Sequence, residues 1–308
     1  MENPELIEKA INYLKSGQLV AFPTETVYGL GGNALSDTAV SAIYAAKGRP
    51  NFNPLIVHVA SPDEAKKYVV WDERAELLAT KFWPGSITFV LPRKADCDLS
   101  LLVSAGMDTV AVRMPAHPIA LSLLEKSGLP LAAPSANISG RISPTMAEHV
   151  RQELGDKIAM VLDGGDCEVG IESTIIDLTT TPATILRHGK ITIDELRKYI
   201  DIEEDKSGKI KAAGMMKSHY APDSIVRLNA KEVREGEALL AFGKPLSGAT
   251  IIENLSEIEN LQEAAANLFR MLRSLDSKTP KAIAVMPIPE MGIGVAINDR
   301  LRRAAAVR

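Results

Sequence analysis

Cysteine is scarce in this chain of 308 residues, which contains only Cys97 and Cys167. The two do not form a C-x-x-C pair, so the sequence offers neither a disulfide framework nor a thiolate zinc site. The five histidines also lack the paired spacing, with one another or with cysteine, that metal sites use. We therefore expect a cytoplasmic protein in which no metal is held by a cage of side chains.

Long apolar runs and a strong excess of one charge are absent as well. No stretch of about 18 apolar residues occurs, so no membrane span is expected. The first 17 residues are acidic and helix-patterned, unlike a secretion signal. The formal net charge of -4 argues against strong nonspecific binding of nucleic acid, although a local basic patch remains compatible with it.

The common nucleotide motifs are also missing. No G-x-x-x-x-G-K-[ST] sequence occurs, which excludes a P-loop. Gly29, Gly31 and Ala34 fit the G-x-G-x-x-G/A fingerprint of dinucleotide-binding proteins. That fingerprint requires an acidic residue at the end of the next strand to hold the ribose. The next strand-like run, 55–60, has none, so NAD binding is disfavoured.

The hydrophobic pattern predicts an α/β protein. Strand-like runs and helical runs alternate up to about residue 154, which favours a parallel sheet. Three strand-like runs, 159–165, 172–179 and 183–189, then follow without a helix between them, so they require antiparallel pairing. We expect a twisted mixed sheet over residues 1–200, a linker over 201–223, and a smaller α/β domain over 224–308.

Cations and hydroxyls stand at several strand ends. Residues 36–47 predict a helix that Gly48 ends in a left-handed conformation. Lys47 and Arg49 leave this turn, which Gly48 and Pro50 restrain, and the pair suits phosphate or carboxylate binding as well as a solvated helix end. Arg113 lies inside an apolar strand and therefore needs a buried partner, either a carboxylate of the protein or one of a ligand. This composition is typical of a site for a polyanionic small molecule.

Several segments resemble the YrdC-like family in order and spacing: FPTETVYGLG, AKGRPNFNPLIVH, WPGSITFVL, VAVRMPAH, APSANISGRISPT and GIESTIID. The later segments AGMMKSHYAPDS and AINDRLRRAA resemble its two-domain members. The resemblance implies a twisted mixed sheet with a concave basic face, followed by a smaller Rossmann-like domain. It also implies condensation of L-threonine, bicarbonate and ATP to threonylcarbamoyl-adenylate and pyrophosphate, followed by transfer to tRNA by a second enzyme system.

The resemblance also implies roles for individual residues. The residues expected around L-threonine are Thr26, His58, Arg113, Ala133 and Ser173. The residues expected around ATP are Arg49, Asn53, Thr109, Ser135, Ser143, Arg187 and Tyr220. Lys47 and Arg49 would stabilise charge at the α-phosphate and the leaving pyrophosphate. Magnesium would arrive with ATP, and the implied partner is a downstream threonylcarbamoyl-transferase system, with weak tRNA contact and no membrane.

The linker departs from the family pattern at one position. Family linkers commonly read Pro-Gly-Met before the His-Tyr pair, whereas Ala213 precedes Gly214 here. We expect a linker that closes over the site and is freer when open, because the proline is missing. Tyr220 would reach the nucleotide from this linker and exclude water.

Two other functions compete with the synthase. A YrdC-like concavity could bind double-stranded RNA or tRNA without turnover. The net negative charge and the second domain favour a small ligand over RNA. Carbamoyl transfer occurs in longer hydrogenase-maturation chains with zinc fingers, which two cysteines cannot build.

Overall fold

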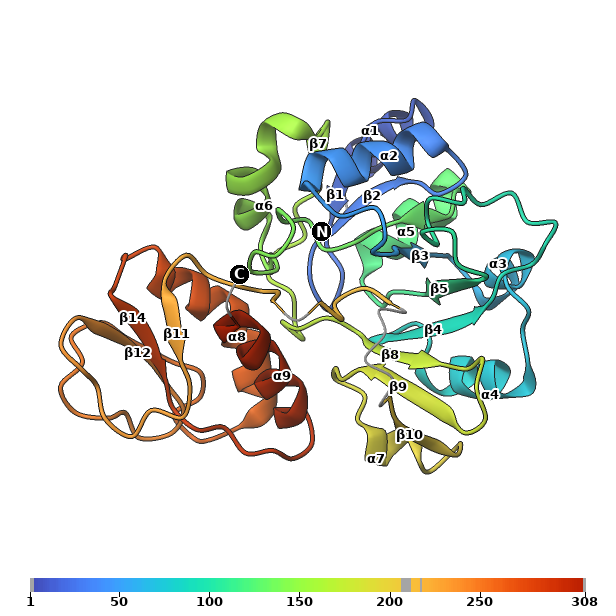
Figure 1. Cartoon of the computed structure of the whole chain (residues 1–308). Coiled ribbons are helices and arrows are strands. Elements are labelled where there is room, and N and C mark those ends of the chain that lie inside the picture. Colours follow the sequence, from blue (N-terminus) through green and yellow to red (C-terminus); the bar gives the residue numbers. More distant parts are fainter. Residues whose placement is uncertain (1–2, 206–211, 217, 307–308) are drawn as a thin grey trace.

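The computed structural model describes residues 3–205, 212–216 and 218–306, which form two α/β units joined by the segment around residues 205–223 (Figure 1). Among these residues, no helix combines the length and the apolar composition that a membrane crossing requires. Residues 206–211 and 217 of the expected linker lie outside the described residues.

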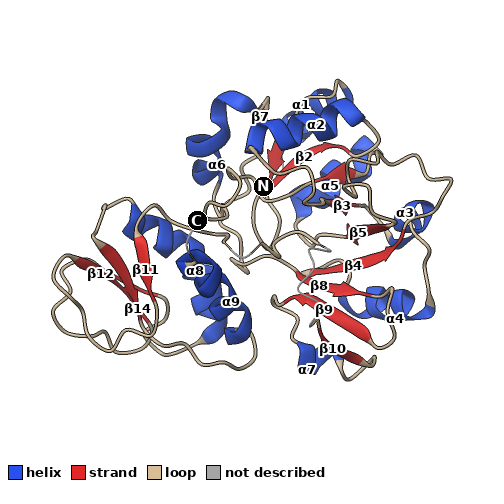
Figure 2. Ribbon diagram, in the orientation of Figure 1, coloured by secondary structure: helices blue, strands red, loops and turns tan. Residues whose placement is uncertain are grey.

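The first unit is built on a sheet of ten described strands in the order β10-β9-β8-β4-β5-β3-β6-β2-β1-β7 (Figure 2). Parallel and antiparallel pairs occur in the same sheet, which confirms the predicted mixed sheet. The strands are β1 (Val20–Phe22), β2 (Gly29–Asn33), β3 (Ile56–His58), β4 (Ile87–Pro92), β5 (Thr109–Arg113), β6 (Leu131–Ala132), β7 (Met160–Val161), β8 (Thr174–Asp177), β9 (Ala183–Arg187) and β10 (Ile202–Glu204).

The helices of this unit begin and end where local chemistry allows. α2 (Asp37–Lys47) starts at Ser36, whose hydroxyl accepts from the Ala39 amide, and ends at Gly48 with a left-handed φ of 58°, as the sequence predicted. The others are α1 (Pro4–Lys15), α3 (Pro62–Tyr68), α4 (Glu73–Phe82), α5 (Pro118–Ser127), α6 (Ala147–Leu154), the short 3-10 helix Gly155–Lys157 and α7 (Ile193–Leu196).

The structure contains one strand that the sequence did not predict, and it contradicts one predicted pairing. β2 is a strand, antiparallel to β1, where the dinucleotide fingerprint needs a turn leading into a helix. A Cβ on Gly31 would lie 2.7 Å from a ring carbon of Phe22, so this glycine serves close packing within the sheet. β7 pairs in parallel with β1 at the sheet edge, and only β8 and β9 form the expected antiparallel hairpin.

The two faces of the first sheet are covered differently. One face packs against α2, α3, α4 and α6 in a large core that includes Val57, Phe89 and Val112. On the other face, α1 and α5 cover the β1 side. The remaining part of that face, which carries Ile56, Ala111 and Ile175, packs against the linker residues Ala212 and Ala213 instead of a helix.

The second unit is smaller and its sheet is wholly parallel, in the order β11-β14-β12-β13. Its elements are β11 (Ile225–Arg227), β12 (Glu237–Ala241), β13 (Ile252–Asn254), α8 (Leu261–Asp276), β14 (Ala282–Val285) and α9 (Gly294–Ala305). Both helices cover the face that looks toward the first unit, while loop residues such as Val233 and Leu246 cover the other (Figure 1). This arrangement agrees with the predicted Rossmann-like domain.

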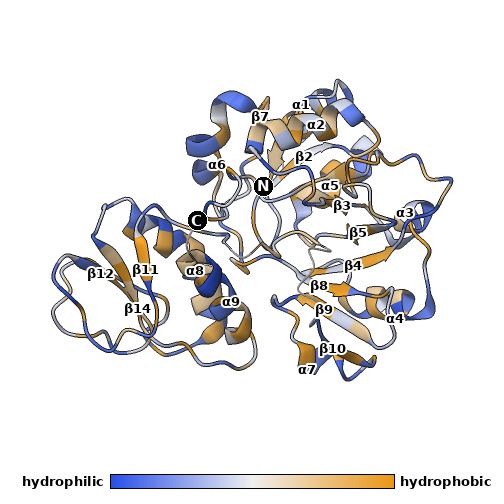
Figure 3. Cartoon of the chain, in the orientation of Figure 1, coloured by the Kyte–Doolittle hydropathy of each residue, from blue (hydrophilic) through white to orange (hydrophobic). Residues whose placement is uncertain are grey.

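The join between the units differs from the expected boundary. β10 pairs in parallel with β9, so the first sheet extends to Glu204 and the boundary that we placed at residue 200 is too early. Val27, Ile142, Val169 and Ile171 of the first unit belong to the same apolar core as α8 and α9. The two units are therefore packed against each other through a shared core. Hydrophobic residues are also prominent on the strands of both sheets, for example β4 and β11 (Figure 3).

Candidate active site

A cavity of about 510 Å³, including its opening to solvent, lies between the partly uncovered face of the first sheet and the linker. Cations and hydroxyl groups dominate its polar lining. The lining residues are Thr24, Thr26, Val27, Gly29, Arg49, Ile56, His58, Arg113, Ala133, Pro134, Ser135, Glu172, Ser173, Arg187, Ala213, Gly214, His219 and Tyr220.

Strand alternation places His58 and Arg113 in this cavity. The two residues are paired in register at the carboxyl ends of the parallel strands β3 and β5. Side chains two apart share a face, so His58 follows Ile56 and Arg113 follows Ala111 onto the face that the linker covers. The carboxyl ends of parallel strands are also where open α/β sheets bind ligands.

Arg113 has protein partners on each of its three nitrogens. Nη2 donates to Glu25 Oε1 at 2.5 Å, Nη1 to Thr26 Oγ1 at 3.0 Å, and Nε to the Gly85 carbonyl at 3.2 Å. The sequence left open whether this buried cation meets a protein or a ligand carboxylate, and the protein partner is Glu25. A guanidinium has five N–H donors, so two have no partner among the described residues and can bind a ligand.

Glu25 is a site residue to which the sequence assigned no role. Its carboxylate also accepts from the Ser86 hydroxyl at 3.1 Å and from the Ala116 amide at 3.0 Å. Burial would raise the pKa of the Glu25 carboxyl, but Arg113 and the Ala116 amide outweigh it and hold this pKa below its usual value. Glu25 is therefore ionised and fixes Arg113. Its position between Thr24 and Thr26, directly after a strand, is the feature of the sequence that could have identified it as a site residue.

His58 is buried and uncharged. Burial and the nearby Arg113 lower its pKa to about 3. The Phe22 ring meets the imidazole edge-on at 6.2 Å between ring centroids. Among the described residues, Nδ1 of His58 has no hydrogen-bond partner. A buried polar atom without a partner is rare in proteins and is available to a ligand.

Ser173 and Arg187 form a second polar group in the cavity. The Ser173 hydroxyl exchanges a hydrogen bond with Thr88 Oγ1 at 2.8 Å and accepts one from Arg187 Nη2 at 3.1 Å. Arg187 also donates to the carbonyls of Ser173 and of Ala213 in the linker. Burial lowers the pKa of Arg187 to about 10, which leaves the guanidinium charged at neutral pH.

Arg49 lines the cavity, whereas Lys47 does not. Arg49 donates to the carbonyls of Asn53 and Pro54, at 3.1 Å and 2.8 Å. Lys47 is buried, and its ammonium donates to the Ser135 carbonyl at 2.6 Å and the Asn137 carbonyl at 2.5 Å. Burial, and then Arg49, hold the pKa of Lys47 well below its usual value. Lys47 thus supports the loop that carries Ser135 from behind.

Three other expected ATP residues lie outside the lining. Thr109 starts β5, at the opposite end of that strand from Arg113. Asn53 donates through Nδ2 to Met216 Sδ of the linker at 3.3 Å. Ser143 donates to Glu172 Oε1 at 2.5 Å, and Glu172 does line the cavity. The structure therefore gathers most of the expected residues, and leaves Thr109 apart from the others.

The described part of the linker is packed over the cavity. Tyr220 has a left-handed φ of 62° and its buried hydroxyl has no described partner. A Cβ on Gly214 would lie 2.8 Å from that hydroxyl, so only glycine fits beside it. Ala213 offers its carbonyl to Arg187.

Comparison with known proteins agrees with this geometry. The family described as "Telomere recombination" (Sua5_yciO_yrdC) matches residues 12–189, and "Threonylcarbamoyl-AMP synthase, C-terminal domain" (Sua5_C) matches residues 191–306. A threonylcarbamoyl-AMP synthase of Pyrococcus abyssi is 43% identical and covers 98% of this chain and 94% of its own. The chain belongs to the threonylcarbamoyl-AMP synthase family.

Other members of this family are similar to this chain over nearly its whole length. A threonylcarbamoyl-AMP synthase of Bacillus subtilis is 39% identical over 99% of this chain and 94% of its own. Among solved structures, P. abyssi Sua5 complexed with L-threonine has a TM-score of 0.92 at 40% identity, covering 99% of this chain and 95% of that one. The similarity thus extends through both units and the linker.

Proposed function

We propose that this chain joins L-threonine, bicarbonate and ATP into threonylcarbamoyl-AMP and pyrophosphate, and so acts as a nucleotidyltransferase. The observation that carries the proposal is the cavity in which the neutral His58 lies among Arg49, Arg113 and Arg187. Such a lining suits two anionic substrates together with an amino acid. The similar P. abyssi structure, solved with L-threonine, supports an amino-acid site in this fold.

The threonine half of the site would use the β3 and β5 ends. The two N–H groups of Arg113 that have no partner in the described part of the chain would bind the threonine carboxylate. His58 Nδ1 would exchange a hydrogen bond with the amine or hydroxyl, because the ring is neutral and this atom has no described partner. Thr26 and Ser173 contribute hydroxyls, and Ala133 contributes backbone.

The reaction would proceed in two bond-forming steps. The threonine nitrogen forms an N–C bond with bicarbonate and water leaves, giving a carbamate. A carbamate oxygen then bonds to the α-phosphorus of ATP while the bond to the bridging oxygen breaks. Pyrophosphate leaves with that electron pair. Such transfer depends on positioning and on stabilising developing charge, not on a nucleophile of the protein.

The nucleotide half would use Arg49, Arg187, Ser135 and Tyr220 directly. We propose that Lys47 acts through the loop at 135–137, because its ammonium holds two carbonyls of that loop. Asn53 would join the nucleotide when the linker moves, since its amide now donates to Met216 of the linker, and Ser143 would contact the nucleotide from the position in which Glu172 holds it. Thr109 lies at the far end of β5, outside the cavity lining, and has no direct contact with the nucleotide in this proposal.

Magnesium would arrive as part of the MgATP substrate. Within the described lining, Glu172 is the one carboxylate, and it is already paired with Arg300. Divalent cations of this kind are commonly held by substrate phosphates and water with few protein carboxylates. The residues present therefore fit a metal carried by the nucleotide.

The decisive experiment measures pyrophosphate and threonylcarbamoyl-AMP with each substrate omitted in turn. We expect release of pyrophosphate to require both L-threonine and bicarbonate, and labelled carbon from bicarbonate to appear in the product. Arg49→Ala and Lys47→Ala should each slow turnover by raising the activation free energy by about 2–4 kcal/mol, the effect of losing an electrostatic donor. Pyrophosphate release that ignores threonine would refute the synthase function.

The product would pass to a threonylcarbamoyl-transferase system that acts on tRNA in the cytoplasm. A filter-binding titration of tRNA at two salt concentrations tests direct contact. We expect weak, salt-sensitive binding, because the chain is net acidic and its cavity is covered by the linker. Tight tRNA binding without ATP turnover would favour an RNA-binding module instead.

A further inference from the structure

Arg300 on α9 is a buried cation that neither the family resemblance nor the cavity lining assigns to the site. Only 1% of its surface is exposed. Nε donates to Glu172 Oε2 at 2.9 Å and Nη1 to Asp299 Oδ2 at 2.9 Å. Its guanidinium carbon lies 5.4 Å from the centroid of the Tyr220 ring. The Arg300 guanidinium of the second domain thus contacts a carboxylate of the first domain.

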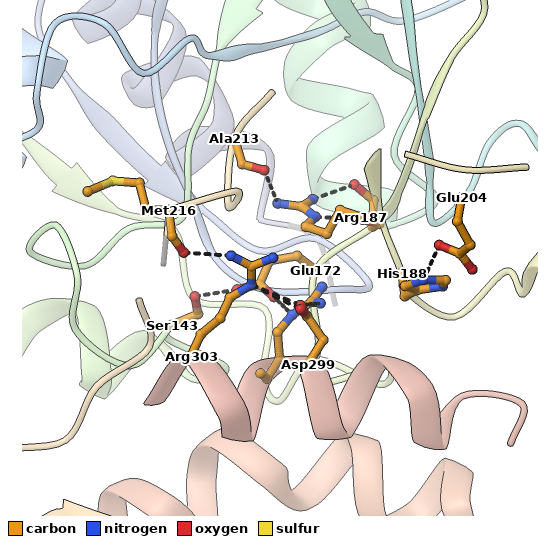
Figure 4. Close-up of polar contacts among 11 residues, drawn as sticks. Ser143, Glu172, Arg187, His188, Glu204, Ala213, Met216, Asp299 and Arg303 are labelled. Atoms are coloured by element: carbon orange, nitrogen blue, oxygen red, sulfur yellow. Dashed lines mark hydrogen bonds and ion pairs between the residues drawn. The ribbon is translucent and has the colours of Figure 1, made fainter. Parts of the chain in front are cut away.

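The partner of Arg300 lies in the candidate active site. Glu172 lines the cavity, immediately before Ser173, and it is the one acidic residue in the lining that the structure describes. Its other oxygen accepts from the Ser143 hydroxyl at 2.5 Å. Figure 4 shows Glu172 between Ser143 on one side and the α9 residue Asp299 on the other.

An acidic side chain is unexpected beside a nucleotide. A carboxylate and a triphosphate repel each other, and the repulsion grows in a buried site where water screens little. An arginine paired with the carboxylate cancels most of its charge. The pair also leaves Glu172 free to hold the Ser143 hydroxyl in place.

We propose that Arg300 is a positioning residue of the nucleotide site, which neutralises Glu172 and so lets the cavity accept the triphosphate. This inference rests on the proposed binding of ATP in the cavity. The second domain would then contribute to the active site of the first. Without Arg300 on α9, the Glu172 carboxylate would lack its described cationic partner.

Arg300 is not needed merely to tether the two domains. Arg303 donates to the Met216 carbonyl at 2.6 Å (Figure 4). Arg273 donates to the Ile142 carbonyl at 2.7 Å and pairs with Glu153 at 2.6 Å. Val169 and Ile171 share a core with α8 and α9. A variant at position 300 therefore keeps several other contacts across the join.

The test compares four variants with the unmodified chain: Arg300→Met, Glu172→Gln, the double variant, and Arg302→Met. Arg302 is a matched control, because it lies on the same helix and pairs only at the surface with Glu290. ATP and threonine affinities are measured directly by calorimetry, alongside KM values and melting temperature. Direct binding keeps the test separate from turnover.

We expect Arg300→Met to weaken ATP binding at least tenfold and threonine binding less than threefold. Adding Glu172→Gln should restore ATP affinity to within about threefold of the unmodified chain, since no carboxylate is then left unpaired. Arg302→Met should leave ATP affinity unchanged. A double variant that binds ATP as poorly as Arg300→Met, or equal losses for ATP and threonine, would overturn the proposal.

Glu172→Gln alone decides the question if Arg300→Met does not fold. Charge neutralisation predicts ATP affinity equal to or tighter than that of the unmodified chain, because one negative charge is removed from the cavity lining while Arg300 keeps its pairing with Asp299. A tether role predicts weaker binding, because Arg300 and Ser143 lose their anchor. If the unmodified chain binds ATP but forms no threonylcarbamoyl-AMP, the proposed function fails while the charge test still stands.

Discussion

At the scale of single residues, the ion pair of Arg113 and Glu25 shows how a site cation is held before substrate arrives. Both side chains are buried, and Glu25 also accepts from Ser86 and Ala116. Attraction between buried charges is largely offset by the loss of their hydration. The pair therefore matters less for stability than for fixing the guanidinium beside His58.

Removing one partner of this pair should be more harmful than removing both. Arg113→Met leaves the Glu25 carboxylate buried and unpaired, which we expect to lower the free energy of unfolding by about 3–5 kcal/mol. The double variant with Glu25→Gln should recover much of that loss. Urea unfolding measures both. Arg151→Met is the control, since Arg151 pairs with Asp163 at the surface and should cost under about 1 kcal/mol. Equal losses for the single and double variants would contradict this account.

His58 should make the protein less stable on acidification. Its pKa is about 3 in the folded chain against 6.5 for a free side chain, so the unfolded chain binds a proton that the folded one excludes. Stability is therefore full above about pH 6.5 and falls as pH drops toward 3, by up to about 1.4 kcal/mol per pH unit. The measurement is urea unfolding between pH 7 and 4. His58→Gln should lack this part of the slope, and identical slopes in the two proteins would show that His58 titrates normally.

The orientation of Lys47 shows what residue-level sequence patterns leave undetermined. The sequence predicted its helix, its position before the left-handed Gly48, and its place near the site. It did not predict that the ammonium binds the carbonyls of Ser135 and Asn137, because that contact joins residues about 90 positions apart. Arg113 is the opposite case: burial within an apolar strand required a partner, and one was found.

At the scale of elements, β2 was missed because its sequence, GLGGN, has no alternation and is rich in glycine. Its strand conformation is supplied by its neighbours β1 and β6 on either side. The parallel pairing of β7 with β1 joins Val20 to Met160 and has no local signal either. Elements with clear periodicity and caps, such as α2 and β5, were predicted well because their own residues determine them.

Gly31 in β2 should be intolerant of any side chain. Its Cβ would lie 2.7 Å from a ring carbon of the buried Phe22, while a Cβ on Gly29 in the same strand would meet its nearest atom at 3.4 Å. We expect Gly31→Ala to lower the free energy of unfolding by about 1–3 kcal/mol, the usual range for overpacking a core. Gly29→Ala is the matched control and should change it much less. Combining Gly31→Ala with Phe22→Leu should restore stability if the ring is the cause.

At the scale of the whole molecule, two domains share one core and one charge network across the linker. The alternation of strands and helices predicted both domains, but nothing in it indicated how they pack. The domains are joined by individual hydrogen bonds between residues far apart in sequence, such as Arg300 with Glu172 and Arg303 with Met216. One of these contacts joins α9 to the linker residue Met216, so we expect domain packing and substrate access to be linked.

Gly170 is the point at which this packing can be tested. A Cβ there would lie 2.5 Å from backbone atoms of Ala265 and Ala266 in α8, which cannot move without shifting the second domain. Gly165 has a similar left-handed φ, 81° against 73°, but nothing lies within 4 Å of its Cβ position. Both alanine variants carry the same backbone strain, of about 1 kcal/mol, and only one carries the clash.

We expect Gly170→Ala to separate the domains, seen as a larger radius of gyration in X-ray scattering and faster hydrogen exchange in α8. Gly165→Ala should match the unmodified chain in both measurements. Because His219 lines the cavity and also donates its amide to the Arg303 carbonyl on α9, Gly170→Ala should in addition weaken retention of ATP. Identical scattering from the two variants would mean that α8 yields at this contact without moving the domain, and that the shared core alone sets the arrangement.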